Sequence, residues 1–128
     1  MEPSNMEVTL YDGKGRPVAY IADDGESSIY LWNGHAVAYL VGENLYGWNG
    51  KHLGWFSGGV LHDLRGYCVG SVGEKSSSAL YAEPAKYAKY AKYGKYGRSG
   101  AHARPGLKSG YSNVPLDDFL KEGAVGKI

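Results

Sequence analysis

Apolar and polar positions alternate in short runs through the first half of the chain, and the runs repeat. Residues 28–40 are SIYLWNGHAVAYL and residues 44–56 are NLYGWNGKHLGWF. Alternation over four to eight residues, interrupted by turn-forming residues, is typical of half-buried β-strands. Each stretch is therefore predicted to form a strand, a tight turn and a second strand.

The repeat has four copies. Each ends in a triplet that begins with a small residue, at Ala19, Ala38, Gly54 and Gly70, with spacings of 19, 16 and 16 residues. A small residue at one position of every copy indicates crowding where the hairpins converge. Because an isolated hairpin is marginally stable in water, the four must share one core. We predict an all-β domain over residues 7–73, with four tandem hairpins, eight short antiparallel strands and pseudo-four-fold symmetry.

Two classes of turn are expected. Asn-Gly at 33–34 and 49–50 predicts type I′ turns, which need positive φ at both central residues. The outer copies instead have Asp-x-x-Gly, at 12–15 and 63–66, which predicts slightly longer loops.

The four copies, the Trp-Asn-Gly turns, the KHLGWF segment and the Asp-x-x-Gly closing copy resemble the bacterial domain family called the four-fold beta flower. The resemblance covers about residues 7–73 and implies the fold. Because that family is named for its shape and has no assigned activity, the resemblance implies no function. A weaker similarity is to MORN-type repeats, whose spacing is longer.

The second half differs in charge and composition. Residues 1–78 contain five Lys/Arg and nine Asp/Glu, whereas residues 79–128 contain nine and four. Residues 74–111 form a Ser/Gly and Lys-Tyr-Ala low-complexity linker that we expect to be mostly disordered. In a polyproline-like helix, its three-residue repeat would align lysines on one edge and tyrosines on another. The repeat consists of Lys86, Tyr87, Lys89, Tyr90, Lys92, Tyr93, Lys95 and Tyr96.

A short amphipathic helix is predicted over residues 112–123. Ser112 or Asn113 is a suitable cap, and Gly123 is a suitable stop. Leu116, Phe119 and Leu120 form one apolar stripe. The stripe could dock on its own domain, on a neighbouring subunit or on another protein, and our expectation is a protein partner or a sister subunit.

No catalytic, metal or cofactor site is predicted. His62 and Asp63 are adjacent, so in a strand their side chains point to opposite faces. His35 and His52 follow equivalent turns, which favours exposed turn exits over a metal site. Cys68, the single cysteine, is expected to be a buried and inert thiol. Trp32, Trp48 and Trp55 fit a hairpin-wedging role better than a ligand platform.

The leading hypothesis is a non-catalytic binding or scaffold module. One alternative is a binder of nucleic acid or another anionic surface, since lysines attract phosphates and tyrosines stack on unpaired bases. The basic segment could equally lie on the acidic body. A further alternative is an enzyme with an unrecognised site. The N-terminal MEPSNMEV lacks the features of a secretory signal and no apolar run is long enough for a membrane span, so we expect a cytoplasmic protein.

Overall fold

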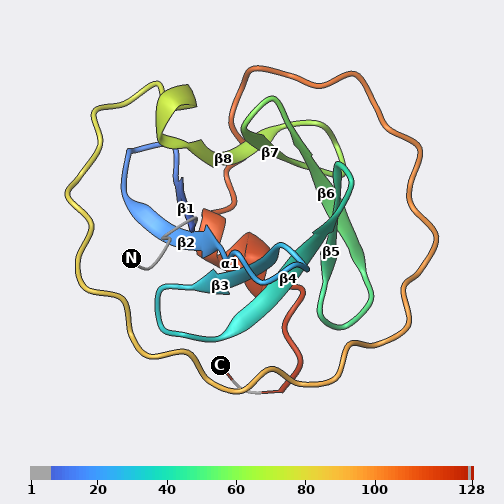
Figure 1. The fold of residues 1–128 in the computed structure, drawn as a ribbon. Helices are drawn as coiled ribbons and strands as arrows, with labels where there is room; N and C mark the ends of the chain where they lie inside the picture. Colours follow the sequence, from blue (N-terminus) through green and yellow to red (C-terminus); the bar gives the residue numbers. More distant parts are fainter. Residues whose placement is uncertain (1–6, 127) are drawn as a thin grey trace.

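The computed structural model describes residues 7–126 and residue 128. Eight strands of this part of the chain form a closed antiparallel barrel in sequence order (Figure 1). The strands are β1 Val8–Tyr11, β2 Pro17–Ile21, β3 Ser28–Leu31, β4 Ala36–Val41, β5 Asn44–Gly47, β6 His52–Ser57, β7 Val60–Asp63 and β8 Cys68–Val72. Pairing of β1 with β8 closes the barrel, so no strand edge stays open. The all-β fold of four hairpins is confirmed, and most of the N-terminal stretch considered for a signal lies outside the described residues.

Every hairpin contains a β-bulge at the same place. The register passes over Val18, Val37, Leu53 and Val69 in turn. Simple alternation would put Val37 on the same face as Tyr39, but the bulge turns Val37 into the core, where it is fully buried. The small residue after each bulge pairs with a large one, as Ala19 does with Leu10. The expected crowding is confirmed, since a Cβ on Gly54 would meet the His62 carbonyl oxygen at 1.9 Å.

The four turns belong to one class, so the predicted division into two classes is wrong. In each turn the first residue donates its N–H to the fifth, and a glycine at the fourth position donates to the first. This is a three-residue loop with a left-handed glycine. Asn33 is not left-handed, because Ser27 is the non-glycine residue with positive φ in the described chain. The Asp and Asn sequences are equivalent because each places a side-chain oxygen on the N–H of the fifth residue.

One end of the barrel is closed by helix α1 (Leu116–Lys121), which lies across the barrel opening in Figure 1. Its stripe of Leu116, Phe119 and Leu120 is buried in the same core as the barrel's inward-facing side chains. Of the three possible docking targets, the structure shows the chain's own barrel. The predicted caps are wrong: the helix starts after Pro115 without a side-chain cap, and the Ser112 hydroxyl accepts the Val114 N–H.

Between the short 3₁₀ helix η1 (Gly73–Lys75) and α1, the chain passes around the outside of the barrel (Figure 1). We call residues 79–108 the belt. It has no regular secondary structure. Our expectation of disorder is nevertheless wrong, because the belt's backbone is hydrogen-bonded to every hairpin turn. The contacts recur every nine residues: Tyr81 N–H donates to the Gly15 carbonyl, Tyr90 to Gly34, Ser99 to Gly50 and Lys108 to Gly66.

Candidate functional site

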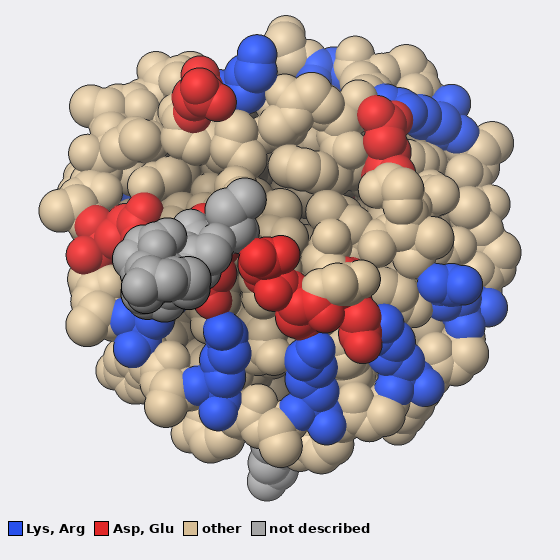
Figure 2. Space-filling model, in the orientation of Figure 1, with Lys and Arg blue, Asp and Glu red and all other residues tan. Residues whose placement is uncertain are grey.

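The four lysines of the Lys-Tyr repeat extend from the belt over the outer wall of the barrel and pair with acidic residues of the barrel domain. Lys86 and Lys89 bind Glu7 at 3.2 and 2.8 Å. Lys92 binds Asp24 at 2.6 Å and Lys95 binds Glu26 at 2.9 Å. Figure 2 shows a row of basic side chains along the lower rim, with acidic side chains beside its inner ends. The basic segment therefore lies on the acidic body of the same chain.

These ion pairs shift the titration of their carboxylates. Burial alone would raise the pKa of Asp24, but hydrogen bonds from Lys92, Ser28 and the loop backbone hold it well below its usual range. Burial likewise opposes the shift at Glu7, where Lys89 and Lys86 lower the pKa. Burial, with help from Glu7 and Tyr30, raises the pKa of Tyr20 to about 12.

An aromatic layer lies between the barrel and the belt. Trp48 and Trp55 are buried there, and Trp32 is half-buried. The Trp32 and Trp48 indole N–H groups donate to belt carbonyls, those of Pro84 and Tyr93. Lysine ammonium groups cover the rings, as Lys95 does at 4.1 Å from the Tyr39 centroid. The tryptophans therefore form no open ligand platform, and their contacts join the hairpins to the belt as well as to each other.

The belt's tyrosines point the other way. Tyr87, Tyr90, Tyr93 and Tyr96 keep 68%, 57%, 53% and 56% of their surface exposed. Their backbones are nevertheless fixed, since Tyr87 donates to the Trp32 carbonyl and Tyr96 to that of Trp48. Tyr90 also stacks on His35, with ring centroids 4.0 Å apart. The lysines of the three-residue repeat thus lie on the barrel wall, and its tyrosines point into solvent.

The residues considered for catalysis lie close together, but each is engaged by the backbone of the fourth turn or of the belt. His62 and Cys68 pair across β7 and β8 and are buried. His62 Nδ1 contacts the Gly66 carbonyl oxygen, and the Cys68 thiol donates to the Lys108 carbonyl. Burial, together with the charge of Asp63, raises the pKa of the thiol. Asp63 turns back onto the N–H groups of Arg65 and Tyr67.

The two histidines considered for a metal have separate partners. His35 stacks on Tyr90, whereas His52 is buried and accepts the His102 N–H at Nδ1. Its Nε2 is buried and has no hydrogen-bond partner among the residues that the structure describes. Burial and the neighbouring His102 lower the pKa of His52. Among residues 7–126 and 128, no three metal-ligating side chains come together.

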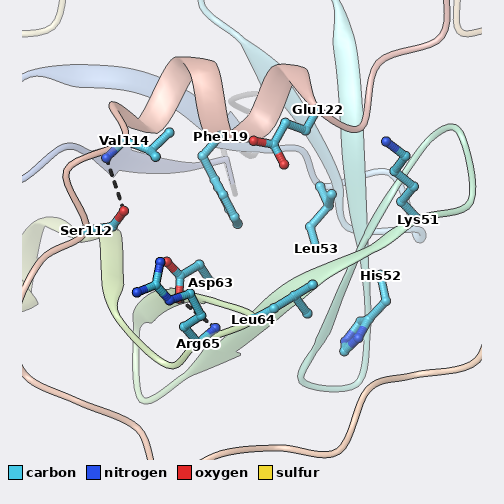
Figure 3. Close-up of a pocket in the computed structure, with 10 residues that line it drawn as sticks. All are labelled: Lys51, His52, Leu53, Asp63, Leu64, Arg65, Ser112, Val114, Phe119 and Glu122. Atoms are coloured by element: carbon cyan, nitrogen blue, oxygen red, sulfur yellow. Dashed lines mark hydrogen bonds between the residues drawn. The ribbon is translucent and has the colours of Figure 1, made fainter.

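Three adjoining hollows lie at the helix-capped end of the molecule. A hollow of about 300 Å³ lies between α1 and the third and fourth turns, with Phe119 pointing into it and Glu122 and Lys51 at its rim (Figure 3). Adjoining hollows follow residues 111–114, the segment that links the belt to α1. No sequence motif predicts these hollows, because their walls come from turns that are far apart in the chain.

The sequence contains a second three-residue pattern, which alternates with the lysines and tyrosines and predicts the contacts of the belt. Every third residue from position 79 to position 106 is Ala or Gly. Four of these, at nine-residue intervals, bring their carbonyl oxygens against the turn glycines, where a Cβ would meet them at 2.1 to 2.6 Å. They are Ala79, Ala88, Gly97 and Gly106.

Comparison with known proteins concerns the fold. A family model described as a 4-fold beta flower protein matches residues 8–120. No curated protein and no solved structure matches the chain. The matched segment includes the barrel, the belt and most of α1. It therefore extends well beyond residues 7–73, for which the sequence motifs indicated the resemblance. No helix in the described residues is long and apolar enough to cross a membrane.

Proposed function

The chain belongs to the 4-fold beta flower family, whose description names a shape and no activity, and we propose that it is a non-catalytic binding module. Its binding surface is the row of belt tyrosines, and its partner is a protein, either a different one or a sister copy. The observation that carries this proposal is that four tyrosines are more than half exposed on a backbone held by the hairpin turns. The single, buried Cys68 supports a cytoplasmic location.

Tyrosine rings suit such a surface for physical reasons. They offer large amphipathic contact areas with little side-chain entropy to lose, which explains their enrichment at interfaces. The belt's backbone bonds mean that little further ordering is needed on binding. The partner surface proposed from the sequence, Leu116, Phe119 and Leu120, is occupied by the barrel core, so the tyrosine row replaces it in our proposal.

A photo-crosslinking residue at Tyr93, compared with one at the exposed Val114 outside the belt, tests this proposal. We expect a discrete crosslinked protein from position 93 and none from position 114. The captured protein, purified, should bind the full chain and lose binding when Tyr87, Tyr90 and Tyr96 are changed to Ser. Equal crosslinking at both positions, or undiminished binding by the serine variant, would contradict the proposal.

Binding to nucleic acid remains a second candidate because the exposed tyrosine rings could stack on bases. Its electrostatic support is weaker than the sequence suggested, since the four lysines of the repeat are already paired with Glu7, Asp24 and Glu26. Retention on single-stranded nucleic acid that falls with salt, and that is lost when these lysines become Gln, would favour this candidate over a protein partner.

A further inference from the structure

Two cations near the helix-capped end, Arg65 of the fourth turn and Lys108 at the end of the belt, differ from most of the belt's cations. Five belt cations, Lys86, Lys89, Lys92, Lys95 and Arg104, form ion pairs with carboxylates. By contrast, neither Arg65 nor Lys108 has an ion pair in the described part of the chain.

Both cations instead approach one aromatic ring. The Arg65 guanidinium carbon and Lys108 Nζ lie 5.6 and 4.8 Å from the centroid of the Tyr67 ring. Lys108 Nζ also donates to the Arg65 carbonyl at 2.7 Å. Cation–π contacts thus hold both cations at one ring, and Lys108 is also bonded to the backbone of Arg65.

A hollow of about 310 Å³ opens beside these cations. Arg65 and Tyr67 line it, together with Tyr111 and residues 112–114. Arg65 also borders the adjoining hollow in Figure 3, where its side chain extends from the fourth turn. None of the described carboxylates lines the hollow beside Tyr67. The nearest acidic residue in sequence, Asp63, lines the adjoining hollow and holds the turn backbone with Oδ1.

The remaining polar groups of the hollow supply donors. The Ser112 hydroxyl oxygen accepts the Val114 N–H, so its hydrogen is left to donate. The exposed Asn113 amide supplies two further N–H donors, and Tyr111, which is 38% exposed, offers an open ring. The hollow thus combines the positive charge of Arg65, several donors and an aromatic surface, and Lys108 contacts the Tyr67 ring that lines it.

We propose that this hollow binds a phosphate monoester of a small molecule. A phosphate group has about two negative charges and three strong acceptor oxygens, which match a guanidinium without an ion pair and several donors better than a single carboxylate does. Arg65 contacts the phosphate, Ser112 and Asn113 donate to it, and the organic group lies against Tyr111. Lys108 adds positive charge from its place at the Tyr67 ring. This inference is independent of the tyrosine row, since none of these residues belongs to it.

Nuclear magnetic resonance titration of the full chain with phenyl phosphate, inorganic phosphate and benzyl alcohol tests the proposal. Phenyl phosphate should shift the amide signals of Tyr67, Ser112 and Asn113 saturably, inorganic phosphate should do so more weakly, and benzyl alcohol should not. Arg65→Gln should weaken phenyl phosphate binding about tenfold.

Lys14→Gln is the matched control, because Lys14 is a turn cation that lines the adjoining hollow on the other side. It should bind phenyl phosphate like the wild type. Asn113→Ala, at an exposed position that should not affect folding, should also weaken binding. The proposal would be overturned by no saturable shift, by an equal response to benzyl alcohol, or by equal losses in the Arg65 and Lys14 variants.

Discussion

Replacing Gly50 by alanine tests how strongly the belt is held on the barrel. Gly50 has a φ of +89°, and a Cβ there would lie 2.1 Å from the Gly97 carbonyl oxygen of the belt. Gly25→Ala is a matched control, because Gly25 has a φ of +79° and no heavy atom of residues 7–126 or 128, apart from Gly25 and its two chain neighbours, lies within 4 Å of its Cβ position. Both variants have the same backbone strain, about 1–2 kcal/mol for a left-handed alanine.

The Gly50 variant must also push the belt away. Two hydrogen bonds lie beside that contact, from Tyr96 N–H to the Trp48 carbonyl and from Ser99 N–H to the Gly50 carbonyl. At about 0.5–1.5 kcal/mol each, their loss costs about 1–3 kcal/mol beyond the control. Urea unfolding monitored by tryptophan fluorescence gives both free energies of unfolding. Equal destabilisation by the two substitutions would refute the claim that the belt is bound at this turn.

Three further predictions concern the helix, the lysines and the buried histidine. Leu120→Ala should lower the free energy of unfolding by about 2–5 kcal/mol, measured in urea, because Leu120 is fully buried in the barrel core. Lys92→Met should raise the pKa of Asp24 toward 3.8, which NMR titration measures. The wild type loses the stabilising contribution of Asp24 as the pH falls below 3.8, and this loss should be smaller in the variant. The lowered pKa of His52 means that its contribution is complete above pH 6.5 and is lost as pH falls through the lower folded-state value. His52→Phe should therefore make the melting temperature depend less on pH between neutral and mildly acidic conditions. An unchanged pH dependence would show that His52 and its contact with His102 do not cause the loss of stability in acid.

The barrel could be predicted from the sequence because its signals are local. Strand alternation, turn glycines and the recurring small residue are all contained within single hairpins of about 16 residues. The bulges could not be predicted, because the sequence around Val37 has the same alternation as a regular strand. Only the pairing with β3 shows that the register passes over Val37. The turn class was missed because Asp12 and Asn33 reach the same kind of N–H from different positions.

The order of the belt depends on contacts between residues far apart in the chain. Tyr81 donates to Gly15 and Lys108 to Gly66, and a composition argument for disorder contains no information about such partners. The directions of lysine and tyrosine side chains follow from those contacts. The hollow beside Tyr67 was equally hidden, because Arg65 and Lys108 belong to a turn and to the end of the belt.

Amide hydrogen exchange along residues 79–108 is the most direct test of this account. The structure predicts protection at Tyr81, Tyr90, Ser99 and Lys108, which donate to the turn glycines. Tyr87 and Tyr96, which donate to tryptophan carbonyls, should also be protected. Amides at Lys89 and Lys92, for which no hydrogen bond to a turn is formed in the described chain, should exchange rapidly. Uniformly fast exchange along the segment would contradict the claim that the belt is an ordered part of the fold.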